Sequence, residues 1–157
     1  MNFEDSLRTA LQGAVKTVIV GIGNELNGDD GFGIRVAERI HQSEKSISIL
    51  AHTVPENFIS VIAAEKPSHV LFLDSAFLDA SPGTLSLLGT EDLARIATVT
   101  HRIPLSKIIE RLVGLHQCQI LIIGLQPKNM DVGSGLSPEV RETADELVDL
   151  LNNIFSI

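Results

Sequence analysis

Short runs of β-branched and aliphatic residues alternate with helix-like segments along the chain, and this alternation limits the fold more than any other feature. The runs expected as strands cover residues 17–23, 47–53, 69–74, 84–88 and 118–125. Three of them, 17–23, 69–74 and 118–125, are almost continuously apolar, which is typical of buried parallel strands. The run 84–88 alternates polar and apolar residues and is expected as an edge strand. The sequence therefore predicts an α/β three-layer sandwich, with a mostly parallel, twisted sheet of about five strands and helices on both faces.

The segments around these strands have apolar residues at helical spacing. The expected helices are about residues 3–12, a segment through Ile34, Ala37 and Ile40, one that begins near Pro55, one from Ile103 with Leu105, Ile108, Ile109 and Leu112, and one from Pro138 with Ser137 as N-cap. In the helix that begins near Pro55, Phe58, Val61 and Ile62 are expected to form the buried face.

Composition and charge exclude several classes of function. A length of 157 residues with 44% hydrophobic residues predicts one folded domain, residues 1–157. The net charge of −8, without a run of Lys or Arg, argues against nucleic acid as a partner. Apolar runs such as 120–125 are far shorter than the ~20 residues that cross a bilayer, so membrane insertion is not expected. Residues 1–8 lack the features of a secretory signal, and Cys118 is the only cysteine, which together predict a cytoplasmic protein.

Three side chains lie where a parallel sheet collects its ligands. Asp30 follows the first expected strand, Asp74 ends the third, and His101 precedes the helix that begins at Ile103. The carboxyl ends of parallel strands meet at one edge of the sheet, so these three side chains can converge there. Two carboxylates and one imidazole suit a borderline divalent ion with positions left open for water or substrate.

Each of these residues also has a structural alternative. Asp29 and Asp30 precede a helix, where aspartate commonly accepts backbone N–H bonds. Asp74 could cap a turn, and a lone histidine such as His101 is usually a surface or satisfied polar residue. The residues alone therefore leave both a metal site and a structural role open.

Other catalytic and binding motifs fit poorly. Gly21-x-Gly23 follows a strand, as in dinucleotide-binding proteins, but Leu26 stands where the third glycine belongs. Neither a phosphate-binding Gly-Lys-Ser/Thr segment nor a Gly-x-Ser-x-Gly nucleophile turn occurs. Cys118 is expected to be a buried small hydrophobe within its strand. The remaining histidines are expected to be structural or solvated, with His41 and His69 peripheral.

Five stretches occur in a characteristic order: Val20-Gly21-Ile22-Gly23-Asn24 with Gly28-Asp29-Asp30-Gly31-x-Gly33, then Val54-Pro55-Glu56-Asn57, Leu73-Asp74, Thr100-His101-Arg102-Ile103-Pro104-Leu105, and Gly124-Leu125-Gln126-Pro127. Together they resemble the hydrogenase maturation endopeptidases, which process the large subunit of nickel-iron hydrogenases. The resemblance spans roughly residues 17–150. The Gly28-Asp29-Asp30 version is most similar to the branch that serves hydrogenase 3 of formate hydrogenlyase. Residues 1–14 extend beyond the usual family start, and the resemblance implies no role for them.

The resemblance implies a function and a site. It implies a nickel-dependent endopeptidase, a hydrolase of the aspartyl type, that removes a C-terminal extension from the precursor large subunit of a [NiFe] hydrogenase after nickel insertion. Asp30, Asp74 and His101 would be the metal ligands and act in catalysis through the metal. Asp29 is a candidate base, and Gly28 and Gln126 are candidate substrate-binding residues. The nickel would come with the substrate, no organic cofactor is expected, and a monomer that pairs transiently with its substrate is expected.

Two other functions remain open from the sequence. A nickel-sensing chaperone of the large subunit would share the fold and bind the precursor without cutting it. A nucleotide-binding α/β protein would be stabilised against heat by NAD or nucleotides.

Overall fold

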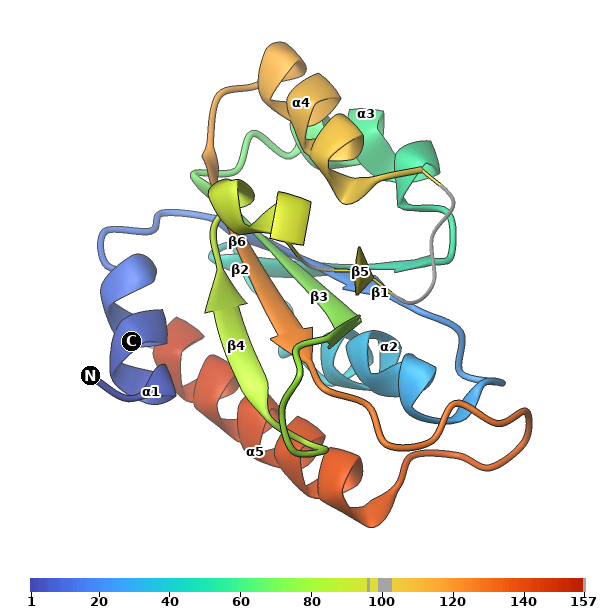
Figure 1. The fold of residues 1–157 in the computed structure, drawn as a ribbon. Helices are drawn as coiled ribbons and strands as arrows, with labels where there is room; N and C mark the ends of the chain where they lie inside the picture. Colours follow the sequence, from blue (N-terminus) through green and yellow to red (C-terminus); the bar gives the residue numbers. More distant parts are fainter. Residues whose placement is uncertain (96, 99–102, 157) are drawn as a thin grey trace.

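A mostly parallel sheet forms the centre of the molecule (Figure 1). The structure is a computed structural model and describes residues 1–95, 97–98 and 103–156. In spatial order its main strands are β2 (Ser46–His52), β1 (Thr17–Ile22), β3 (His69–Phe77), β6 (Gln119–Leu125) and β4 (Leu85–Leu88). The first four are parallel, and β4 pairs antiparallel with β6 at one border. The short β5 (Ala97–Thr98) pairs antiparallel with the end of β3. The predicted α/β fold, with an edge strand near residues 84–88, is confirmed.

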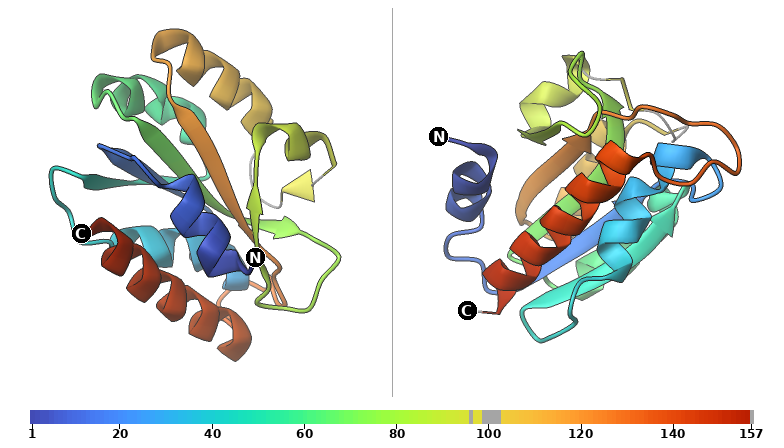
Figure 2. Two further views of the ribbon diagram at one scale, coloured as in Figure 1. Left: turned by 90° about the vertical axis from the view of Figure 1, so that its left-hand side faces the viewer. Right: turned by 90° about the horizontal axis from the view of Figure 1, so that it is seen from below.

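Helices cover both faces of the sheet (Figure 2). On one face lie α1 (Phe3–Ala10), α2 (Phe32–Glu38) and α5 (Pro138–Phe155), and on the other lie α3 (Ile59–Ala64) and α4 (Leu105–Leu115). Three 3₁₀ turns within the described residues, η1 (Gly28–Gly31), η2 (Pro55–Phe58) and η3 (Thr90–Arg95), connect these elements. None of the helices in the described part of the chain has the length and apolar character needed to cross a bilayer.

The continuous apolar runs are explained by the two cores that the sheet separates. In β1, Ile19 points into the core beneath α1, α2 and α5, whereas Val18 and Val20 point into the core beneath α3 and α4. In β3, Leu71 and Phe72 are divided between the two cores in the same way. A strand buried on both faces needs apolar residues at every position, which removes the alternation that marks a half-exposed strand.

The helix expected from Pro55 differs from the prediction. Its first turn is the 3₁₀ turn η2, and the α-helix begins only at Ile59. Ile59 and Ile62 form the buried face, while Phe58 is half-buried and Val61 is 51% exposed, so the placement of Val61 in the core was wrong. A 3₁₀ turn has about three residues per turn, so it rotates the following helix away from the phase of a continuous α-helix.

Two further side chains lie elsewhere than expected. His69, predicted to be peripheral, is the first residue of β3 and is buried, and this burial lowers the pKa of its imidazole. Cys118 immediately precedes β6 and is half-buried rather than fully buried. Burial raises the pKa of its thiol, which disfavours the reactive thiolate.

Candidate functional site

The carboxyl ends of β1, β3 and β6 meet at one edge of the sheet, called here the carboxyl edge. Helix α2 packs directly against this edge, because Gly33 has no side chain. A Cβ at Gly33 would lie 2.5 Å from the carbonyl oxygens of both Ile22 and Leu73, the backbone of β1 and β3. The 3₁₀ turn η1, which precedes α2, is thereby held over the ends of these two strands.

Asp30 lies in η1 and is only 1% exposed. Its carboxylate Oδ2 accepts a hydrogen bond from the backbone N–H of Asn24 at 3.0 Å. The turn folds back so closely over the end of β1 that a Cβ at Gly23 would lie 1.9 Å from the Asp30 carbonyl oxygen. Gly23 has a φ of +143°, which other residues rarely adopt. The glycine after β1 therefore allows Asp30 to lie at the carboxyl edge.

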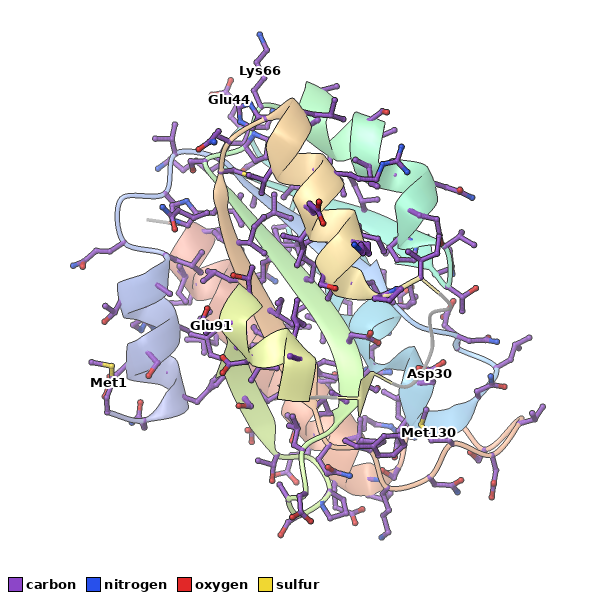
Figure 3. The ribbon with its side chains drawn as sticks, turned by 45° about the horizontal axis from the view of Figure 1, so that its top comes forward. Met1, Asp30, Glu44, Lys66, Glu91 and Met130 are labelled. Carbon is purple, nitrogen blue, oxygen red and sulfur yellow. The ribbon has the colours of Figure 1, made fainter. Side chains whose placement is uncertain are left out.

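Asp74 reaches the same edge from β3 and is also 1% exposed. Its Oδ1 accepts a hydrogen bond from the backbone N–H of Ser75 at 2.8 Å. The Ser75 hydroxyl in turn donates to the carbonyl oxygen of Asp29 at 2.9 Å. Because Asp29 precedes Asp30 and Ser75 follows Asp74, this bond joins the two backbone segments that carry the predicted carboxylates. Figure 3 shows Asp30 at this edge, opposite the end where Lys66 and Glu44 lie.

His101, the third predicted ligand, lies outside the described residues. Of the described residues nearest to it in the sequence, Ala97 and Thr98 form β5, which pairs with Ala76 and Phe77 just beyond Asp74, and Ile103 lies shortly before α4. Within residues 1–95, 97–98 and 103–156, no three His, Cys, Asp or Glu side chains are grouped to hold a metal ion. The ligand set of Asp30, Asp74 and His101 therefore stays a prediction.

Asp29 is completely buried, and its carboxylate binds the loop between β6 and α5. Oδ2 accepts the backbone N–H groups of Lys128 and Asn129, each at 2.8 Å. Oδ1 accepts the backbone N–H of Ser137 at 2.7 Å, and the Ser137 hydroxyl lies within 3.0 Å of both oxygens. The Asp29 N–H donates to the Asn129 carbonyl oxygen at 2.7 Å. These contacts favour a positioning role for Asp29 over that of a base.

Ser137 occupies the N-cap position of α5, as predicted, but its side chain makes no capping bond within the helix. Its hydroxyl is used by Asp29 instead. The two residues are 108 positions apart. No local sequence pattern could have indicated this contact, and sequence analysis therefore missed the role of Ser137.

Gly28 is constrained by the same loop. It has a φ of +59°, and a Cβ there would lie 2.3 Å from the Asn129 carbonyl oxygen and 2.8 Å from the Ser134 hydroxyl. Close contact between two backbone segments is therefore reason enough for a glycine at this position. Its role in substrate binding stays a prediction.

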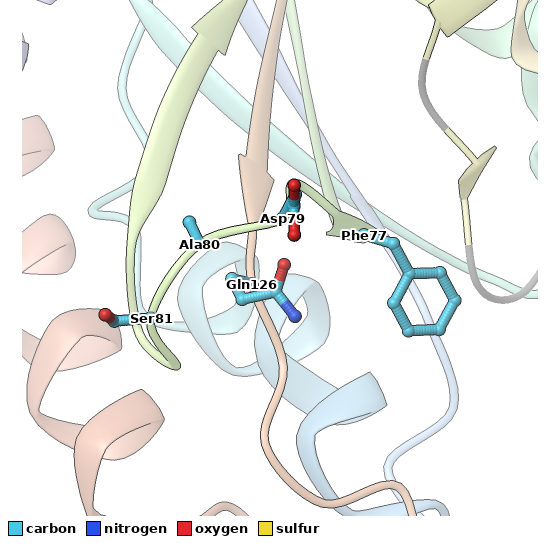
Figure 4. A pocket seen from close by; sticks show the side chains of 5 residues that line it. All are labelled: Phe77, Asp79, Ala80, Ser81 and Gln126. Atoms are coloured by element: carbon cyan, nitrogen blue, oxygen red, sulfur yellow. The ribbon is translucent and has the colours of Figure 1, made fainter.

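Gln126 holds the loop that follows β3. Its Oε1 accepts the backbone N–H of Leu78 at 2.7 Å, and its Nε2 donates to the Pro127 carbonyl oxygen at 3.1 Å. It also lines an open hollow of about 720 Å³ together with Phe77, Asp79, Ala80 and Ser81 (Figure 4). Gln126 thus borders a hollow at the carboxyl edge, and the hydrogen bonds of its amide hold the loop after β3.

Comparison with known proteins identifies the family of this chain. The family model of the hydrogenase maturation protease HycI matches residues 34–154. The chain belongs to the hydrogenase maturation protease family. The resemblance found in the sequence is therefore confirmed, and membership makes the chain a peptidase.

Relatives in the family support this over nearly the whole chain. A putative hydrogenase maturation protease of Methanocaldococcus jannaschii is 34% identical, covering 96% of this chain and 95% of that protein. The hydrogenase 3 maturation protease of Escherichia coli K12 is 29% identical over 70% of this chain and 72% of its own. The crystal structure of the [NiFe] hydrogenase maturation protease HycI from Thermococcus kodakarensis has a TM-score of 0.90 at 28% identity, covering 97% of this chain and 99% of that one.

Proposed function

We propose that this hydrogenase maturation protease is the endopeptidase that removes the C-terminal extension of the precursor large subunit of a [NiFe] hydrogenase after nickel has been inserted. The observation that carries the proposal is the presence of two buried carboxylates, Asp30 and Asp74, on backbone segments that a hydrogen bond from Ser75 to Asp29 holds together at the carboxyl edge. The similarity to the hydrogenase 3 maturation protease of Escherichia coli supports a precursor of the hydrogenase 3 type as the substrate.

Nickel is part of the substrate in this proposal. The precursor would present it held by cysteine thiolates, and Asp30, Asp74 and His101 would supply oxygen and nitrogen donors at its remaining positions. Asp30 and Asp74 would offer carboxylate oxygens, and His101 an imidazole nitrogen, which are donor types that a borderline divalent ion accepts. A site of two carboxylates and one imidazole also leaves coordination positions open. The donor set therefore fits a metal that arrives with other ligands already attached.

The chain's own contribution is to position the substrate. Contact of Asp30, Asp74 and His101 with the nickel would fix the neighbouring peptide bond of the precursor at the carboxyl edge. Fixing two reactants in this way can remove several kcal/mol from a barrier, within a ceiling of about 7–11 kcal/mol. The nickel would supply Lewis acidity toward the carbonyl oxygen or water. Precursor that lacks nickel would not be held, which makes nickel insertion a condition for cleavage. No organic cofactor enters this scheme, and the chain would act as a cytoplasmic monomer.

The proposal is tested by mixing the purified chain with precursor of its hydrogenase, prepared with and without nickel, and measuring intact mass. Shortening of the nickel-loaded precursor alone is expected. Asp30→Ala, Asp74→Ala and His101→Ala should each lower kcat/KM by about 100-fold or more, since each removes a contact needed to position the peptide bond.

The matched control is Asp149→Ala, which removes an exposed acid of α5 and should cleave at the parent rate. Parent-rate cleavage by the three site variants would refute the assignment of the ligands. Stable binding of the loaded precursor with no change in its mass would instead identify a non-cleaving chaperone.

A further inference from the structure

Exposed apolar side chains gather at the carboxyl edge. The described residues include nine large hydrophobic side chains that are at least 40% exposed. Five of them end β3, follow other strands or precede α4 at this edge, and we call them the apolar edge residues: Leu26, Val54, Phe77, Ile103 and Val132. Exposed apolar residues scattered singly need no explanation, whereas a group around a functional site is typical of a protein interaction surface.

Backbone contacts hold the segments that carry these residues side by side. Leu26 and Val132 are neighbours, because the N–H of Gly133 donates to the Leu26 carbonyl oxygen at 2.8 Å. They are also the most exposed members of the group, at 69% and 82%. Asp29 connects the loop of Leu26 to the loop of Val132 by accepting the N–H groups of Lys128 and Asn129. These hydrogen bonds, beside Asp30, fix the separation of the two loops.

Two other apolar edge residues, Phe77 and Val54, lie at or just beyond the ends of strands β3 and β2. Phe77 lies three positions beyond Asp74 and pairs with Ala97 of β5. Val54 follows β2, whose last residue, His52, accepts the Gly23 N–H at 2.9 Å beside the end of β1. Figure 1 shows the segments after β1, β2 and β6 at the same edge of the sheet.

Charge at this edge is acidic. Glu25, Asp79 and Asp131 are exposed in the same loops as the apolar edge residues. Residues 23–31, 53–58, 77–84 and 126–137 contain one basic side chain, Lys128, and its ammonium group is 2.6 Å from the carboxylate of Glu139. Arg102, which precedes Ile103 in the sequence, lies outside the described residues. A complementary surface is therefore apolar and positively charged.

We propose that the apolar edge residues form the docking surface for the folded precursor, which would present an apolar and positively charged surface around its nickel. The inference rests on the proposed function, in which the precursor itself brings the nickel to the buried carboxylates at this edge. An apolar contact around the carboxylates would exclude water and add affinity that the metal contacts alone do not supply.

The test compares two double variants that change side chains of the same kind at opposite ends of the sheet. Leu26→Asn/Val132→Thr alters the carboxyl edge. Leu115→Asn/Val15→Thr alters the other end, where Leu115 and Val15 are 64% and 75% exposed. All four side chains are exposed, so both variants should fold. The dissociation constant for nickel-loaded precursor is measured by calorimetry, and KM and kcat for its cleavage are measured separately.

The edge variant should raise the dissociation constant and KM by about tenfold or more with kcat nearly unchanged, and the opposite variant should stay within about twofold of the parent. Equal behaviour of the two variants, with normal cleavage by the parent, overturns the docking surface and leaves the proposed function intact. If the parent binds precursor without cutting it, the proposed function fails, and the dissociation constants still decide the docking surface.

A second copy of this chain is the competing occupant. Sedimentation of the parent over a range of concentrations should give a monomer. A dimer that the edge variant abolishes and the opposite variant retains would assign the surface to self-association and overturn the proposal. Failure of the parent to bind nickel-loaded precursor at all would overturn it as well.

Discussion

At the scale of single residues, the two neighbouring acids Asp29 and Asp30 have different tasks, although the sequence shows them as a pair. Asp30 accepts its bond from Asn24 in its own loop and lies over the end of β1. Asp29 turns to the opposite side and receives donors from Lys128, Asn129 and Ser137. One residue therefore supplies the predicted ligand, and its neighbour fixes the loop that borders the site.

Replacing Asp29 by Asn tests whether the hydrogen bonds of its carboxylate hold the loop between β6 and α5. The amide keeps the size of the side chain but turns one acceptor into a donor that faces N–H groups. We expect a loss of about 2–3 kcal/mol in the free energy of unfolding, because buried bonds to a charged group are lost. Hydrogen exchange at the amides of Lys128, Asn129 and Ser137 should become faster, while exchange in β1 should change much less.

The control for Asp29→Asn is Ser137→Ala, which removes only the Ser137 hydroxyl and keeps the backbone N–H that donates to Asp29. It should cost about 1 kcal/mol and change the same amides in the same direction. Unchanged exchange in the 128–137 segment of both variants would show that Asp29 does not hold this loop.

The site could be predicted from the sequence only as far as local rules reach. Asp30 was found because it follows an apolar strand, and Asp74 because it ends an apolar run. The structure places Asp74 within the last residues of β3 and Asp30 over the end of β1. The partners of Asp29 could not be found, because they lie about a hundred positions away and no periodic pattern encodes a loop-to-loop contact. His101 as a ligand stays a prediction that rests on the family resemblance.

At the scale of elements, α2 determines where η1 lies, and a single glycine sets how close α2 comes to the sheet. Gly33 lies against the backbone of both β1 and β3, so a side-chain methyl group at this position would clash with that backbone. The phase of α3 shows the same dependence on local backbone geometry. The 3₁₀ turn η2 rotated Val61 out of the core, which apolar spacing alone could not indicate, because Val61 and Ile62 are both apolar.

Gly33→Ala should therefore displace α2 and the turn that carries Asp30. A Cβ 2.5 Å from two carbonyl oxygens cannot be relieved by side-chain rotation, so we expect a loss of about 3 kcal/mol in the free energy of unfolding. Cleavage of nickel-loaded precursor should fall with it. Urea denaturation and kcat/KM check both effects.

Gly114→Ala is the matched substitution in α4, where a Cβ meets nothing within 4 Å. Removing a glycine from an exposed helical position should stabilise the chain by about 0.5–1 kcal/mol and leave cleavage unchanged. If Gly33→Ala were tolerated as well as Gly114→Ala, the close packing of α2 would not be what positions Asp30.

At the scale of the whole molecule, the residues that stabilise the fold are different from the residues predicted to bind the metal. Two apolar cores, one on each face of the sheet, contain residues from β1, β3 and β6 and from all five helices of the described chain. Asp30 and Asp74 lie at the carboxyl edge and belong to neither core, and no group of three potential metal ligands occurs among the described residues. The fold is therefore expected to form without a metal ion, unlike small domains whose folding depends on a four-ligand zinc site.

This separation predicts an asymmetric response to metal removal. Treating the protease with a chelator and then removing the chelator should change its melting temperature by less than about 1 °C and leave cleavage of nickel-loaded precursor intact, because the nickel comes with the substrate. The same treatment of the precursor should abolish cleavage. Restoring nickel to the precursor, but not to the protease alone before mixing, should recover it. A protease that loses activity after its own treatment, and regains it only when preloaded with metal, would show a resident cofactor and contradict the role of nickel as part of the substrate.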